Sequence, residues 1–303
     1  MVYEAAPESW RLDSVWVLDT APGGPLRALH TGSFMTLSGD GWLDRPVPAV
    51  PFRRPGGCVG AAPDGVVRLD DEGALYYVHD NGETRQLKAR SGSVSGERLV
   101  WDATADRAVL WDGWSDTAWV SGGRRWRKLR PGSDSGEAVL CGTPRGVYLL
   151  HGRQLWLLDG DEWRSVGRAG PGWRGNAMWW SPTLGGLWIL TDEAIDLWTD
   201  DGPRTVATPT LPALRRGDHF EDTWRYQVCT GYDPLSNTLL WHMERYAVKP
   251  DSPDLTRAEE LKLRHRGFAV RRPTVRTMLL RLDDLALPSA SLPEPRGNWT
   301  AAP

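Results

Sequence analysis

The chain has 303 residues, and its 36 Lys and Arg against 39 Asp and Glu give a formal net charge of -3. This balance provides no basic field for nonspecific nucleic-acid binding, and no apolar run approaches the roughly 20 residues of a membrane helix. The first residues, MVYEAAPESWRLDS, lack the basic and apolar regions of a secretory signal, and Cys58, Cys141 and Cys229 form no CxxC motif. We therefore expect a globular cytoplasmic protein that binds no membrane, and the charge balance argues against nucleic acid as its main partner.

Hairpin-like segments recur along the chain, each with two apolar runs around a short turn. They lie at 15–32, 58–71, 99–113, 138–152, 177–191 and 227–243. A third apolar strand, a turn rich in Gly and Asp, and a fourth strand follow each of the first five hairpins. The fourth strands open at Trp42, Thr84, Trp126, Trp163 and Arg204, which are 37 to 42 residues apart.

Four short strands in each unit of about 40 residues are typical of a β-propeller. We predict an all-β fold, a six-bladed propeller of four-stranded antiparallel blades that spans residues 1–303 as a single domain. The predicted blades lie roughly at 15–48, 58–90, 99–131, 137–168, 176–207 and 226–286. The last blade shows three strands, and its fourth is expected either from residues 10–12, which we favour, or from residues 297–299.

The third unit resembles a known repeat family. Residues 101–113 (WDATADRAVLWDG), followed by 116–119 and 122–126, resemble the bacterial kelch-type repeat and the blades of the galactose-oxidase central domain. The double glycine of that repeat is reduced here to pairs such as Asp112-Gly113 and His151-Gly152. The resemblance implies the propeller fold and, because kelch-like propellers mostly bind proteins, a binding function. It does not extend to a copper site, since no Tyr, Cys and His set can be matched.

The chain contains 18 tryptophans, whose flat indole faces could stack on sugars. Thirteen of them fall at equivalent strand positions of the repeat, where we expect them to pack between blades. These are Trp16, Trp42, Trp101, Trp111, Trp119, Trp126, Trp156, Trp163, Trp179, Trp180, Trp188, Trp198 and Trp241. Trp114, Trp173, Trp224 and Trp299 fall in predicted loops and are the better candidates for binding.

One repeat column, directly after the second strand of each unit, holds His30, Asp70, Asp112, His151, Thr191 and His242. Such a ring could bind a metal or carry acid–base chemistry. However, second strands lie well away from a propeller axis, so these side chains would be too far apart to share an ion. We expect each to bond to its own loop, and we predict no metal, no cofactor and no catalytic residue. His242, close to Glu244, is the one position where an exception could arise.

The last unit also carries an insertion at 243–277 with nine Lys and Arg against five acidic residues. Residues 253–266 read as a helix, with a capping box from Thr256 to Glu259 and Gly267 at its end. Long insertions in compact domains are often functional.

Within a blade, the loop from the second to the third strand emerges on the same face as the crossover to the next blade. The expected contact residues on that face are Arg53, Arg54, Trp114, Trp173, Arg174, Arg215, Arg216, His219, Lys262, Arg264, Arg266, Arg271 and Arg272. Arginine and aromatic residues are favoured at protein interfaces, so we predict a non-catalytic platform that binds a protein with an acidic or mixed surface. The alternative is an enzyme or glycan-binding protein with inward-facing carboxylates or histidines at the mouth of the central channel. Single-stranded nucleic acid is a weaker alternative.

Overall fold

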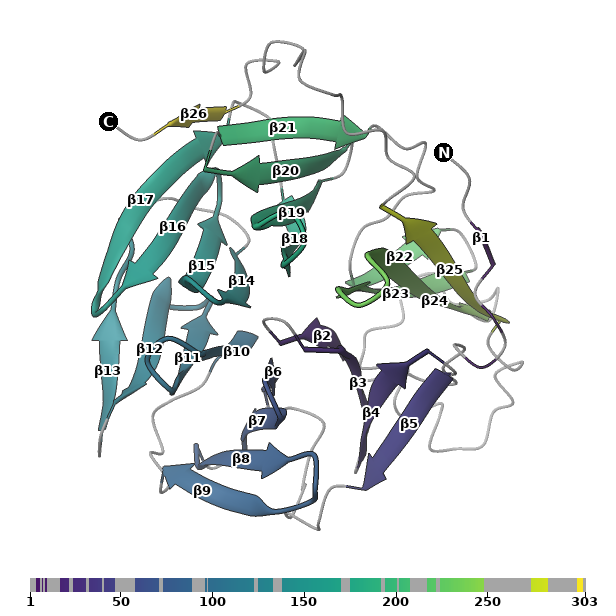
Figure 1. The fold of residues 1–303 in the computed structure, drawn as a ribbon, viewed down its shortest axis with the longest axis horizontal. Coiled ribbons are helices and arrows are strands. Elements are labelled where there is room, and N and C mark those ends of the chain that lie inside the picture. Colours follow the sequence, from purple (N-terminus) through teal and green to yellow (C-terminus); the bar gives the residue numbers. More distant parts are fainter. Residues whose placement is uncertain are drawn as a thin grey trace.

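The computed structural model describes residues within 4–9, 17–46, 58–88, 96–132, 138–169, 175–207, 217–247, 274–282 and 299–301, with gaps of one or two residues inside these ranges. Along β1, β22, β26 and parts of several other strands, the backbone alone is described. The described strands form six antiparallel sheets around a central axis (Figure 1). The predicted six-bladed all-β propeller is therefore confirmed. Among the residues that the structure describes, no helix has the length and apolar character needed to cross a bilayer.

The first five blades are meanders, each running from an innermost strand outward. Blade 1 consists of β2 (Val17–Thr20), β3 (Leu26–His30), β4 (Ser33–Ser38) and β5 (Gly41–Pro46). Blade 2 consists of β6 (Val59–Ala62), β7 (Gly65–Leu69), β8 (Leu75–His79) and β9 (Thr84–Lys88). Blade 3 consists of β10 (Arg98–Asp102), β11 (Arg107–Asp112), β12 (Thr117–Gly122) and β13 (Arg125–Leu129). Blade 4 consists of β14 (Ala138–Thr143), β15 (Gly146–His151), β16 (Gln154–Asp159) and β17 (Glu162–Ala169). Blade 5 consists of β18 (Gly175–Ser181), β19 (Gly186–Thr191), β20 (Ile195–Thr199) and β21 (Gly202–Ala207).

Blade 6 closes the ring by combining strands from the amino-terminal and carboxyl-terminal parts of the chain. It contains β23 (Trp224–Asp233), β24 (Thr238–Ala247), β25 (Thr274–Arg281) and, as its fourth strand, β1 (Glu4–Ala5), with Glu4 opposite Leu279. The favoured amino-terminal closure is confirmed, but the pairing residues are 4–5 instead of 10–12. With Ala5 as the last paired residue, the chain that follows has ample length to cross the three strand spacings of ~4.8 Å between the edge of blade 6 and β23 before β2 begins at Val17.

Three other predictions in this part of the chain need correction. The insertion is shorter than 243–277, because β24 continues to Ala247 and β25 begins at Thr274. His219 and Trp224 were expected in loops, but they lie in β22 (Gly217–Glu221) and β23, which pair with each other. Trp299 lies in β26 (Trp299–Ala301), which adds a fifth strand to blade 4 by pairing with β17. These strands form because a backbone at a sheet edge satisfies its hydrogen bonds by pairing. The helix predicted at 253–266 lies outside the described residues.

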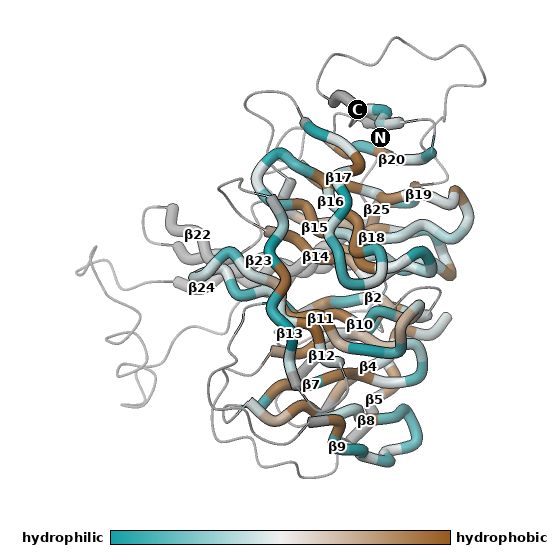
Figure 2. Tube along the Cα trace, turned by 90° about the vertical axis from the view of Figure 1, so that its left-hand side faces the viewer, coloured by the Kyte–Doolittle hydropathy of each residue, from teal (hydrophilic) through white to brown (hydrophobic). Residues whose placement is uncertain are grey.

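The described residues of the core form six apolar clusters, one between each pair of neighbouring blades. All six residues of β11 are buried: Ala108 and Leu110 face blade 2, whereas Val109 and Trp111 face blade 4. Alternate residues of a strand point to opposite faces, so an inner strand with a neighbour on each side is apolar at successive positions. In Figure 2 the apolar colour accordingly follows inner strands such as β14 and β18.

The tryptophans follow the predicted packing. Eleven of the thirteen are described, and every one of these belongs to an inter-blade cluster. Trp101, Trp111, Trp179 and Trp188 are buried, and the other seven are partly buried. Trp16 and Trp241 lie outside the residues whose side chains are described.

Candidate functional site

Strand connectivity divides the surface into two faces. The crossover face carries the connections from second to third strands and from one blade to the next. The turn face carries the short turns between first and second and between third and fourth strands. Both faces present features that could bind a partner.

Trp114 is the one predicted contact residue whose side chain the structure describes, and its side chain is 93% exposed. It lies on the crossover face, in the turn between β11 and β12. The Asp112 carboxylate accepts hydrogen bonds from the Trp114 backbone N–H (3.1 Å) and the Ser115 hydroxyl (2.6 Å). The Thr117 hydroxyl donates to the Ser115 carbonyl at 2.9 Å, and Asp116 adopts a left-handed φ of 46°. The turn is therefore held by its polar residues, and the indole takes no part in its bonding.

A second turn of the same design lies on the opposite face. In the turn between β23 and β24, Asp233 accepts from the Ser236 hydroxyl at 2.6 Å, and Thr238 donates to the Ser236 carbonyl at 2.9 Å. Asn237 takes the left-handed conformation with a φ of 47°. The residue equivalent to Trp114 is Leu235, which is 72% exposed. The two turns thus present an apolar side chain in the same way on the two faces.

The His/Asp column acts locally where it was predicted to, with one exception. Asp70 accepts from the Ala74 N–H at 2.8 Å, Asp112 holds its own turn, and Thr191 bonds to Ala194 in both directions. Among the residues that the structure describes, no group of three His, Cys, Asp or Glu could hold a metal ion. The side chains of His30 and His242 lie outside that part of the chain.

His151 departs from the prediction for this column. Its ring is 1% exposed, lies 5.0 Å from the ring of Trp111, and has Nε2 3.4 Å from a carboxylate oxygen of Asp116. The reason is that the turn of blade 3 covers the end of the second strand of blade 4. His151 therefore faces a neighbouring blade instead of its own loop.

The channel-mouth alternative requires inward carboxylates that are available for chemistry. Among the residues with described side chains on β2, β6, β10, β14, β18 and β23, the acidic ones are Asp19, Asp102 and Asp233. Asp19 accepts from the Ala61 N–H of the next blade at 2.7 Å, and Asp102 accepts from Thr104 and from the Arg107 guanidinium. All three carboxylates, including Asp233, thus accept structural hydrogen bonds.

Of the other predicted contact residues, His219 is described by its backbone in β22. The side chains of all of them lie outside the described residues: Arg53, Arg54, Trp173, Arg174, Arg215, Arg216, His219, Lys262, Arg264, Arg266, Arg271 and Arg272. Cys58 and Cys141 are buried and form no disulfide within the described residues, as expected for small core residues, and the Cys58 thiol donates to the Gly96 carbonyl.

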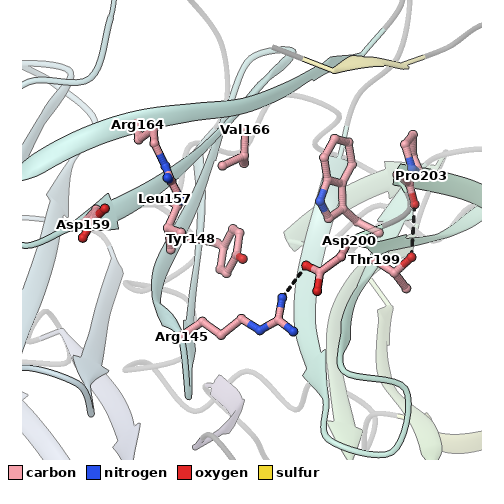
Figure 3. A pocket seen from close by; sticks show the side chains of 11 residues that line it. Arg145, Tyr148, Leu157, Asp159, Arg164, Val166, Thr199, Asp200 and Pro203 are labelled. Carbon is pink, nitrogen blue, oxygen red and sulfur yellow. Dashed lines mark hydrogen bonds and ion pairs between the residues drawn. The ribbon is translucent and has the colours of Figure 1, made fainter. Parts of the chain in front are cut away.

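A pocket of about 540 Å³, which the sequence did not reveal, opens between blades 4 and 5 (Figure 3). Tyr148, Leu157 and Arg164 lie opposite one another on three neighbouring strands of blade 4 and form one wall. The facing wall comes from blade 5, with Trp198, Asp200 and Pro203. The turns that carry Arg145 and Asp200 place the pocket near the turn face.

The pocket is lined by four charged side chains, of which two form an ion pair and two do not. The Arg145 guanidinium donates to Asp200 across the blade boundary and lies 5.5 Å from the centre of the Trp180 ring. This bond holds the pKa of Asp200 below its usual range and raises the pKa of Arg145, while burial raises the pKa of the Tyr148 hydroxyl. Asp159 and Arg164, in contrast, have no ion-pair partner within the described ranges. The pocket therefore offers one satisfied ion pair and one separate cation and anion.

The pocket exists because one tryptophan of the repeat is missing. Trp42, Trp126 and Trp163 open the fourth strands of blades 1, 3 and 4, and each packs against the preceding blade. In blade 5 the strand register puts Pro203 at this position, opposite Trp198. The repeat spacing in the sequence predicted Arg204 at this position, which is one residue too late. A small ring therefore stands where three other blades have an indole.

Neither a family model nor a curated protein matches this chain. Among solved structures, it is similar to a streptogramin B lyase at 7% identity and a TM-score of 0.51, over 92% of this chain and 97% of that one. A YCF48 protein bound to D1 peptide has 10% identity, a TM-score of 0.43 and coverage of 79% and 81%. A virginiamycin B lyase from Staphylococcus aureus has 9% identity, a TM-score of 0.47 and coverage of 82% and 88%. At 7% sequence identity, the similarity to the streptogramin B lyase supports the propeller fold alone.

Proposed function

We propose that this protein is a non-catalytic platform that binds another protein through its crossover face. The observation that carries the proposal is the exposure of Trp114, at 93%, on a turn whose hydrogen bonds do not involve the indole. Every other tryptophan with a described side chain packs into an inter-blade cluster. Folding therefore gives no reason for a large aromatic residue at position 114.

Binding does give such a reason. Tryptophan is enriched among the few residues that dominate interface energies, and a rigid aromatic side chain loses little entropy when it is buried. The Asp112 carboxylate fixes the turn before a partner arrives, so little ordering is left to oppose association. The arginines expected on the same face favour a partner with an acidic or mixed surface. A cytoplasmic location and a kelch-type ancestry are part of this proposal.

The test compares two matched variants. Wild-type protein, Trp114→Ala and Leu235→Ala are immobilised and exposed to lysate of the source cells, and bound proteins are quantified by mass spectrometry. The partner should bind wild type and Leu235→Ala equally, and Trp114→Ala about tenfold or more weakly. Leu235 is the control because it occupies the same position of the same turn on the other face.

Binding by the purified partner must then reproduce this difference in titrations. A third variant that lacks residues 250–272 tests the insertion without cutting β25, and it should lose binding while keeping its melting temperature. Equal binding by wild type and Trp114→Ala, or selective loss with Leu235→Ala, would contradict the proposal.

A further inference from the structure

The pocket between blades 4 and 5 has the shape of an unfilled aromatic site. At three other blade boundaries an indole from the fourth strand fills this level of the interface, through Trp42, Trp126 and Trp163. At the boundary between blades 1 and 2 the equivalent residue is Thr84, and the fully buried Arg27 guanidinium lies between those blades. Between blades 4 and 5 the residue is Pro203, and about 540 Å³ remains open.

The lining suits a planar ring. Tyr148 and Leu157 belong to the apolar cluster of this boundary, with Val166 and Trp198 packed against it, and all four line the pocket. Small-molecule sites are typically cavities of about 300–1,000 Å³ with apolar and aromatic walls and a few placed polar groups. The position that other blades fill with an indole is therefore open here to a ring from outside the chain.

The charges of the lining select among aromatic ligands. Arg145 and Asp200 neutralise each other, so a ligand meets Arg164 and Asp159 as the separate charges. Arg164 and Asp159 occupy diagonal positions on two neighbouring strands, because Arg164 lies opposite Leu157 and Asp159 follows Leu157 by two residues. Such diagonal positions are ~7–8 Å apart in an antiparallel sheet. A purely anionic ligand would meet an unpaired Asp159, and a purely cationic ligand would meet an unpaired Arg164.

We propose that this pocket binds an aromatic amino acid in its zwitterionic form. The ring occupies the space that the small Pro203 side chain leaves open between Tyr148 and Trp198. The carboxylate pairs with Arg164, and the ammonium group pairs with Asp159. This inference is independent of the proposed protein-binding function, because the pocket opens near the turn face and Trp114 lies on the crossover face.

L-Tryptophan is the probe, since an indole already fits the equivalent level at other boundaries. Calorimetric titration of the full chain should show saturable 1:1 binding at millimolar concentration or below. Tryptamine lacks the carboxylate, indole-3-acetate lacks the ammonium group, and indole lacks both. Each analogue should bind about tenfold or more weakly than L-tryptophan, because each leaves a charged hydrogen bond unmade. Absence of saturable binding, or an analogue that equals or exceeds L-tryptophan, would overturn the proposal.

Variants locate the site. Arg164→Gln and Asp159→Asn should each weaken L-tryptophan binding about tenfold or more, whereas Arg168→Gln, on the same strand but outside the pocket, should not. Pro203→Trp should fill the space, raise the melting temperature and abolish binding. Unchanged binding by folded Pro203→Trp would place the ligand elsewhere and reject this site. The analogue series on wild-type protein decides the chemistry even if that variant does not fold.

Discussion

Two tryptophans three residues apart in blade 3 have opposite environments. Trp111 is 2% exposed at the end of β11, and Trp114 is 93% exposed in the turn that follows. Trp111 packs between blades 3 and 4 together with Val109 and Leu149. Trp114 contributes to its turn only through its backbone N–H. The same side chain therefore serves stability at one position and leaves it unaffected at the other.

This contrast predicts the stability of two variants. Trp111→Ala should lower the free energy of unfolding by about 3–5 kcal/mol, because it removes a buried ring and leaves a cavity. Trp114→Ala should change it by no more than about 0.5 kcal/mol, as for other exposed positions. Urea unfolding followed by far-UV circular dichroism measures both. A loss above about 2 kcal/mol for Trp114→Ala would mean that the indole is part of the fold.

Residue types in their repeat columns predicted the environment of the tryptophans but not that of His151. The column position correctly suggested a polar residue at the end of a strand. It could not show that the neighbouring turn, with Asp116, covers that strand end and buries the ring. Contacts between blades depend on the three-dimensional arrangement of turns, which no single repeat records.

At the scale of strands and turns, arginines connect successive blades. Three ion pairs share one design: Arg27 with Asp80, Arg107 with Asp161 and Arg145 with Asp200. Each arginine lies at or near the start of a second strand, and each aspartate lies in the turn before the fourth strand of the next blade. The partners are 53, 54 and 55 residues apart. This near-constant separation, longer than one repeat, is a signal that a search across blades could have found.

The contribution of these ion pairs to stability is expected to follow the burial of the arginine side chain. Arg27 is fully buried and donates to the carbonyls of Ala62 and Gly65 as well as to Asp80, whereas the side chain of Arg145 is 44% exposed. Arg27→Ala should cost about 2–4 kcal/mol, since it leaves buried carbonyl oxygens without a donor. Arg145→Ala should cost about 1 kcal/mol or less, as exposed ion pairs do. Parallel urea denaturation measures both, and equal losses would show that burial does not set the strength of these links.

The link between Arg145 and Asp200 also predicts a pH dependence. The guanidinium lowers the folded-state pKa of Asp200, so the folded protein releases this proton more readily than the unfolded chain. The contribution is complete at neutral pH and disappears as the pH falls from the usual aspartate range through the lowered pKa. The stability difference between wild type and Asp200→Asn should therefore be constant near neutral pH and shrink toward zero in acid, with a plateau of about 1 kcal/mol or less. A difference that grows on acidification would contradict the assignment.

At the scale of the whole molecule, the repeat predicted the six blades, their strand order and amino-terminal closure. The pocket remained hidden because of one residue. The expected alignment placed Arg204 at the start of the fourth strand of blade 5, but β21 begins at Gly202, and Pro203 lies opposite Trp198. A shift of one residue moves every side chain of a strand to its other face. The missing indole was visible in the sequence, since neither residue is Trp, but the register determines that Pro203 and not Arg204 lines the boundary with blade 4.

Closure of the ring provides the last prediction. The pairing of β1 with β25 is short, with Glu4 opposite Leu279 and Ala5 opposite Met278, but the same segment continues into blade 1 and so ties blade 6 to it. By contrast, β26 only adds an outer edge strand to blade 4. Removal of residues 1–6 should lower the melting temperature by several degrees, corresponding to about 1–2 kcal/mol. Removal of residues 298–303 should lower it less, because every blade keeps its four strands. Differential scanning calorimetry of the two truncations decides, and a larger loss for the carboxyl-terminal truncation would assign the closing role to β26.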